Sequence, residues 1–152
     1  MKQQNSYIIE HMNHDKSIQE QIVLERFRKH FPGFPKGSVI KTESPDFLLL
    51  RGNRPAVGIE LTSLPFPNYT LGNENNEDFI SGIFHSISRK QEKLKNYRQK
   101  HAEAYWLIIF ADSIEFNGFS INGQFEAAIS KNGFDRVFLF DLFEAKVWEI
   151  GK

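Results

Sequence analysis

Cysteine is absent from the sequence, which excludes disulfide bonds and zinc sites built from thiolates. Long apolar runs are absent too, since no stretch approaches the roughly 20 residues that a membrane-spanning helix needs. The polar start of the chain, MKQQNSYIIEHMNHDKS, has no signal-peptide core. From these absences we expect a soluble, cytoplasmic protein with no membrane partner.

The chain also has no net charge, because 19 basic residues balance 19 acidic ones. Such a protein has no overall field that attracts nucleic acid, so binding of that kind would depend on a local patch. Residues 86–101, SISRKQEKLKNYRQKH, are such a basic patch, and the acidic stretch NENNED at 73–78 precedes them. This separation of charge is typical of a domain with one binding side, although a solvated helix face has the same pattern.

Two common kinds of chemistry find no support in the sequence. The five histidines show no zinc-ligand spacing on one element, and no GxSxG motif is present to indicate a serine hydrolase. With 152 residues, of which 40% are hydrophobic, the chain has the size of one globular domain with a substantial core. We therefore expect a single domain over residues 1–152.

Helical and strand patterns alternate along the chain. One helix is expected from Asp15 or Ser17, either of which can cap it, to about residue 30, where PGFP ends it. A second helix is expected at about 78–100, and the apolar run at 104–110 is typical of a central strand covered on both faces. The other expected segments are strands at 38–41, 46–50, 56–62, 136–143 and 145–150, a loop over about 63–78 and a short amphipathic stretch at 124–131. This order predicts an α/β fold with a mixed central β-sheet flanked by helices.

The hairpin expected near the middle of this order carries two carboxylates. If residues 51–55 form its turn, Leu50 pairs with Ala56. In that register Asp46 lies directly opposite Glu60, with both side chains on the same face. Two like charges this close repel each other unless a divalent cation or a shared proton lies between them. The alternative is that Asp46 merely opens its strand and Glu60 points to solvent.

Pro45 and Asp46 at the start of one strand, followed by Glu60 within the next, resemble the core motif of the PD-(D/E)xK nuclease superfamily. The order helix, hairpin, helix, strand over about residues 15–112 is similar to the restriction-endonuclease-like core. The resemblance implies a nuclease that hydrolyses phosphodiester bonds with Mg²⁺ or Mn²⁺, which hard carboxylate ligands suit. In this superfamily the third motif position is usually a lysine that helps to position the attacking water, whereas here it is Thr62.

Thr62 leaves two interpretations open. In some members of the superfamily the lysine lies on a helix that approaches the same site, and Lys90 could serve here because it falls on a predicted inward stripe with Ile87 and Leu94. Lys90 could equally extend its charge to solvent. Without a catalytic lysine, the domain would be inactive and would act as a module that binds nucleic acid or protein.

The first helix offers a further ligand, because nucleases of this superfamily often carry a glutamate there that points into the site. Glu20 lies along the apolar stripe that contains Val23, Leu24 and Phe27, whereas Glu25 falls on the opposite side. We therefore expect Glu20 as a third metal ligand. A capping role near the start of the helix is the alternative.

The resemblance thus implies a defined set of residues. Asp46, Glu60, Lys90 and Thr62 occupy the catalytic positions, and Asp46, Glu60 and Glu20 hold the metal. Arg89, Gln91 and Lys93 are expected to bind the substrate, which is DNA or RNA. The nuclease-like core leaves the strands at about 136–150 as a C-terminal addition, and a homodimer would supply the two active sites that symmetric cleavage of a duplex needs.

Overall fold

The structure is a computed structural model that describes residues 2–64, 68–71, 76–97, 102–116, 121–129 and 132–152. Its main feature is a six-stranded sheet in the order β1-β2-β3-β5-β7-β8. The strands are β1 (Ser38–Lys41), β2 (Phe47–Arg51), β3 (Arg54–Ser63), β5 (Ala104–Ala111), β7 (Arg136–Asp141) and β8 (Lys146–Gly151). The central strands β3, β5 and β7 are parallel, and the outer pairings are antiparallel. The predicted α/β fold with a mixed central sheet is thereby confirmed.

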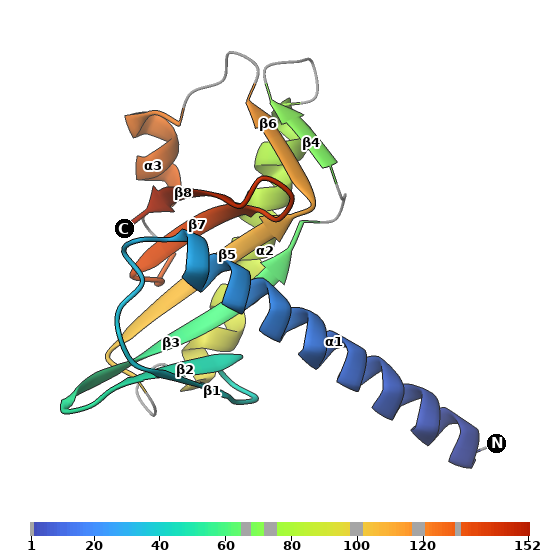
Figure 1. The fold of residues 1–152 in the computed structure, drawn as a ribbon. Helices are drawn as coiled ribbons and strands as arrows, with labels where there is room; N and C mark the ends of the chain where they lie inside the picture. The colour runs from blue at the N-terminus through green and yellow to red at the C-terminus, as the bar shows by residue number, and fades with distance from the viewer. Residues whose placement is uncertain (1, 65–67, 72–75, 98–101, 117–120, 130–131) are drawn as a thin grey trace.

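Helices cover both faces of this sheet (Figure 1). They are α1 (Lys2–His30), α2 (Asn76–Tyr97) and α3 (Gly123–Ile129). α1 buries Leu24 and Phe27 against one face, whereas α2 buries Ile83 and Ile87 against the other. None of the described helices combines the length and the apolar character needed to cross a membrane. The two faces of β3 are therefore covered by different helices, and this decides what its side chains meet.

Both long helices differ in detail from their predicted form. α1 begins at Lys2, so Asp15 and Ser17 lie inside the helix and not at its start. Residues 2–14 contain no proline or glycine that would have prevented helix formation. On α2, Phe84 lies three residues before Ile87, a spacing that would place it on the predicted inward stripe, yet it is 36% exposed. Residues 98–101 of the basic patch lie outside the described part of the chain.

A second, two-stranded sheet was not predicted. It pairs β4 (Asn68–Leu71) with β6 (Ser113–Phe116) in parallel. β4 therefore lies in the region of 63–78 that the sequence pattern assigns to a loop. Each strand has four residues and its partner is distant in the chain, so the pairing has no local signal.

The β2–β3 hairpin has the predicted register. Leu48 pairs with Gly58, and the neighbouring residues of both strands follow in order. β2 itself begins at Phe47, one residue after Asp46. Continuing the register by two residues from the Leu48–Gly58 pair brings Asp46 level with Glu60.

The turn of the same hairpin is shorter than predicted. Only Gly52 and Asn53 form it, and Gly52 has the positive φ of 63° that such tight turns require. The predicted five-residue turn and the pairing of Leu50 with Ala56 are therefore wrong. A register shift next to Leu50, of the kind a β-bulge produces, compensates for the shorter turn.

Gly58 allows two other residues to pack closely beside the start of β2. A Cβ atom at this position would lie 2.5 Å from two ring carbons of Tyr105 and 3.0 Å from Cγ of Pro45. Tyr105 is fully buried, so its ring has no room to retreat. Glycine at position 58 thus keeps Pro45, and with it the next residue Asp46, close to β3.

We expect Gly58→Ala to lower the free energy of unfolding by about 1–3 kcal/mol, because overpacking a rigid site forces strain on its neighbours. Urea denaturation of the variant and the wild type measures this difference. Gly123→Ala is the matched control, since nothing lies within 4 Å of the Cβ position there. Equal losses in the two variants would contradict the close-packing role of Gly58.

Candidate active site

Two carboxylates are held close together, Asp46 just before β2 and Glu60 within β3. Glu60 is 2% exposed and lies on the face of β3 opposite to Ile59 and Leu61, which pack toward α1. Asp46 is 8% exposed, and its Oδ2 accepts a hydrogen bond from the backbone N–H of Leu61 at 2.8 Å. The backbone of β3 thus fixes Asp46 beside the strand that carries Glu60.

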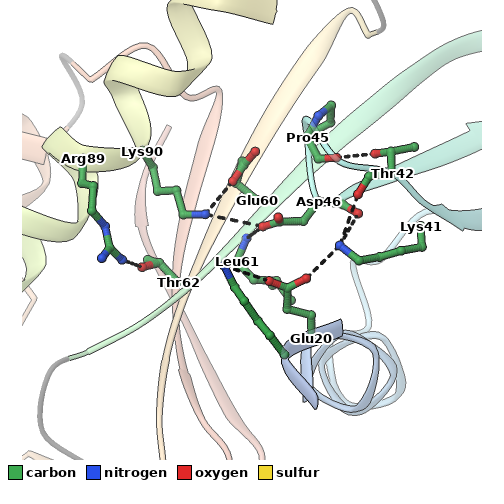
Figure 2. A network of polar contacts seen from close by, with 11 residues as sticks. Glu20, Lys41, Thr42, Pro45, Asp46, Glu60, Leu61, Thr62, Arg89 and Lys90 are labelled. Carbon is green, nitrogen blue, oxygen red and sulfur yellow. Dashed lines mark hydrogen bonds and ion pairs between the residues drawn. The ribbon is translucent and has the colours of Figure 1, made fainter. Parts of the chain in front are cut away.

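Lys90 reaches both carboxylates from α2 (Figure 2). Its Nζ donates a hydrogen bond to Oε2 of Glu60 at 2.8 Å and lies 3.6 Å from Oδ2 of Asp46. Lys90 itself is buried on the same helix face as Ile87 and Leu94. The two carboxylates therefore meet at one cation, the ammonium group of Lys90. We call these three residues the buried ion cluster.

The buried ion cluster also explains how two acids can be buried beside a largely apolar part of the sheet. Charged groups removed from water lose a large hydration free energy, which only close opposite charges and hydrogen bonds can offset. Lys90 contacts one oxygen of each carboxylate, and Leu61 adds a backbone donor. Neither acid is left in the sheet without a compensating donor.

Thr62 is joined to α2 through Arg89. It lies on the same side of β3 as Glu60 and is 4% exposed. Its Oγ1 accepts a hydrogen bond from Nη2 of Arg89 at 2.7 Å. Adjacent residues of α2 thus contact the same face of β3, with Lys90 at Glu60 and Arg89 at Thr62 (Figure 2).

Glu20 points from α1 toward the same region but pairs with other groups. Its Oε2 lies 2.8 Å from Nζ of Lys41, and its Oε1 lies 3.8 Å from Nζ of Lys16. Lys41 in turn donates a hydrogen bond to the backbone carbonyl of Asp46 at 3.1 Å. Over the described residues, no group of three His, Cys, Asp or Glu side chains is arranged to hold a metal ion. Glu20 thus pairs with lysines in this structure, and its role as a third metal ligand stays a prediction.

Two surface pockets meet at Lys16 and Glu20 and give access to these residues. The first, which we call the basic pocket, has a volume of about 260 Å³; its lining includes Lys16, Glu20, Thr62, Arg89, Lys90 and Lys93. The second, which we call the acidic pocket, has a volume of about 510 Å³; its lining includes Lys16, Glu20, Lys41, Glu43 and Asp46. Asp46, Thr62 and Lys90 are therefore reachable from solvent through pockets on two sides of α1, whereas Glu60 lines neither pocket.

A larger cavity of about 790 Å³ lies elsewhere, beside Ile114, Asp141 and Trp148. The buried carboxylate beside it, Asp141, already accepts hydrogen bonds from the backbone N–H groups of Ile114 and Glu144. None of the predicted site residues lines it. Size alone therefore does not identify the chemically interesting pocket.

The remaining predicted substrate contacts divide into two groups. Lys93 and Arg89 line the basic pocket, as a substrate-binding role requires. Gln91 is half-buried and lines neither of the two pockets.

Two lysines of the site have no counterpart among the predicted residues, namely Lys41 and Lys16. Lys41 ends β1 and pairs in the sheet with Phe47, the residue after Asp46. Pairing the 38–41 segment with the next strand would have placed Lys41 beside the site. Lys16 lies one helical turn before Glu20, a spacing that predicts contact between the two side chains.

Comparison with protein-family models, with curated proteins and with solved structures finds no match to this chain. A fold alone does not determine a function, since one architecture can serve many activities. The chemistry of the buried ion cluster and its pockets therefore carries the functional argument.

We expect Lys90→Met to lower the free energy of unfolding by about 3 kcal/mol at neutral pH, because it leaves two buried carboxylates without their cation. Adding Glu60→Gln to this variant should recover part of the loss, since one uncompensated charge is removed. Chemical denaturation of both variants and the wild type measures these changes.

The matched control for this experiment is Lys95→Met on the same helix. Lys95 pairs with Glu92 at 3.0 Å, but both side chains are largely exposed. Exposed pairs of this kind contribute about 1 kcal/mol or less. A Lys90→Met variant as stable as Lys95→Met would contradict the proposed compensation of the two carboxylates.

Proposed function

We propose that the protein is a metal-dependent nuclease that hydrolyses phosphodiester bonds in DNA or RNA, with a restriction-endonuclease-like core. The observation that carries this proposal is the convergence of Asp46, Glu60 and Lys90 in the buried ion cluster. Two acids and a lysine are the residue types of the PD-(D/E)xK motif, here with the lysine supplied by α2. Nucleic acid and Mg²⁺ are both present in the cytoplasm, where we propose that the protein acts.

The residues suit a hard divalent cation in kind and in number. Mg²⁺ is commonly bound by one or two carboxylates, with waters and substrate phosphates completing its coordination. Asp46 and Glu60 would hold it, while Glu20 would join only if its ion pair with Lys41 opened. Bound there, Mg²⁺ or Mn²⁺ would activate a coordinated water and neutralise charge on the phosphate.

The protein's own groups would do the rest. The Lys90 ammonium group can hold the attacking water or stabilise the negative charge that develops on the phosphate, because its contacts with Glu60 and Asp46 keep it in one place. The Leu61 N–H keeps Asp46 in one orientation, so that carboxylate needs little rearrangement during the reaction. A homodimer with two such sites would cut both strands of a duplex.

The second candidate function is a catalytically inactive module of the same fold that binds nucleic acid or protein. Two observations favour it. Lys90 is already engaged by both acids, and Thr62 has no ammonium group to contribute. Metal binding and cleavage separate this candidate from the nuclease.

We expect Mg²⁺ or Mn²⁺ to raise the melting temperature of the wild type, because a ligand that binds only the folded state stabilises it. At about 100 times its Kd, the metal would add about 2.7 kcal/mol to the free energy of unfolding. Asp46→Asn should be at least as stable as the wild type without metal, and it should gain nothing when metal is added. Glu92→Gln, which alters an exposed carboxylate on α2, is the control and should keep the full shift. Equal shifts in all three proteins would exclude a metal site at Asp46.

We expect Lys90→Ala to abolish metal-dependent cleavage of single- and double-stranded DNA and RNA, with circular dichroism to verify the fold. Asp46→Asn is a second inactive variant that should fold stably, and Lys95→Ala on the exposed face should retain activity. If Lys90→Ala keeps full activity, Lys90 is not the catalytic lysine. If the wild type cleaves nothing while Thr62→Lys does, the inactive module is the correct function.

A further inference from the structure

The basic pocket has a marked excess of positive charge for a protein with no net charge. Four cationic side chains line it, Lys16, Arg89, Lys90 and Lys93, against the single carboxylate of Glu20. The neighbouring acidic pocket has the opposite balance, because Glu20, Glu43 and Asp46 face only Lys16 and Lys41. Charge is thus divided between the two sides of α1, which indicates that the two pockets receive different groups.

The cations of the basic pocket are not equally available to a ligand. Lys90 is engaged by two carboxylates, and Lys16 lies 3.8 Å from Glu20. Arg89 and Lys93, by contrast, form no ion pair with any described carboxylate. They are four residues apart on α2 and therefore lie on the same side of the helix.

Arg89 is held in place by a group that leaves its charge intact. Its partner is the hydroxyl of Thr62, which is buried and neutral. A hydroxyl fixes the guanidinium group through one N–H and leaves other N–H groups of the fork to bind a ligand. A lysine at position 62 would instead place a second cation against Arg89 and repel it.

We propose that the basic pocket is a phosphate-binding subsite, in which Arg89 contacts a phosphate group of the nucleic acid and Thr62 is the positioning residue for Arg89. This inference rests on the proposed function and deepens it, because it assigns a substrate group to one side of the site. A guanidinium fork matches the geometry of a phosphate and binds it through two parallel hydrogen bonds. Lys93 adds a second charge from the same helix.

The subsite also gives Thr62 a role of its own. The position that carries a lysine in the PD-(D/E)xK motif here anchors an arginine, and Lys90 lies beside it at the carboxylates. The phosphate in the basic pocket would lie next to the buried ion cluster. The subsite therefore aligns the substrate and takes no part in holding a metal.

Binding without metal tests the subsite independently of cleavage. The probe is a fluorescently labelled single-stranded oligonucleotide in EDTA, titrated with protein at several salt concentrations and followed by anisotropy. We expect Arg89→Ala to weaken binding about tenfold, the equivalent of about 1.4 kcal/mol. The slope of log affinity against log salt should fall by about 0.7, as expected for the loss of one phosphate contact in a single strand.

Thr62 variants separate positioning from charge. Thr62→Val keeps Arg89 but removes its anchor, so affinity should fall by about threefold, or roughly 0.65 kcal/mol, while the salt slope changes little. Thr62→Ser keeps the hydroxyl and should restore wild-type affinity, which a merely structural effect of the substitution would not do. Lys29→Ala, which removes an exposed charge from α1 outside the basic pocket, is the control for a general loss of one positive charge and should bind like the wild type.

Oligonucleotides with and without a 5′-phosphate identify the phosphate that the subsite takes. Tighter binding of the phosphorylated form assigns the subsite to a strand end, and equal binding assigns it to an internal phosphodiester. Wild-type affinity in Arg89→Ala, or no binding by the wild type at low salt, would overturn the subsite. If oligonucleotide binding depends on Arg89 but the protein cleaves no substrate, the phosphate-binding subsite is supported and the nuclease activity is rejected.

Discussion

The ammonium group of Lys90 is the point on which the rest of the site depends. It lies against Glu60 and Asp46, which are both buried and so are removed from most of the water that would hydrate a charge. A well-packed apolar set of residues would often be as stable as a buried ion pair. The presence of three charged groups here is therefore better explained by a functional role than by a contribution to the stability of the fold.

Neighbouring features of the fold support this cluster. Gly58 lets Pro45 approach β3, and the backbone N–H of Leu61 orients Asp46, which follows Pro45 in the chain. The buried stripe of α2 directs Lys90 inward. A second layer of contacts links α1 to the end of β1 through Glu20 and Lys41. The result is a site in which each of the three carboxylates lies within 4 Å of a lysine ammonium group, in a chain whose total charge is zero.

Sequence reasoning succeeded where a short-range pattern decides the geometry. Strand alternation places Glu60 and Thr62 on one face, and helical periodicity places Lys90 on a buried stripe. Even with a wrong turn, the register of the hairpin was predicted correctly, because the shift next to Leu50 compensates for the shorter turn.

Prediction failed where the decisive contact joins segments that share no local pattern. The ion pair of Glu20 with Lys41 joins α1 to β1, and the β4–β6 pair joins two four-residue strands that are distant in the chain. The start of α1 was missed for a different reason: Asp15 and Ser17 are good capping residues but lie within a continuous helix. Pairings between distant segments, such as Glu20 with Lys41 and β4 with β6, are fixed only when the whole chain packs.

Lys90 lies on α2, which is part of the connection between the parallel strands β3 and β5. This position affects the order in which the parts of the site come together during folding. Asp46 and Glu60 belong to a hairpin, which can form from neighbouring residues, whereas pairing of β3 with β5 requires the crossover through α2. Non-local pairings of this kind form late, because a long loop must close first. The hairpin can therefore form with its two acids still exposed to water, before Lys90 arrives. The site becomes complete only in the step that completes the parallel sheet.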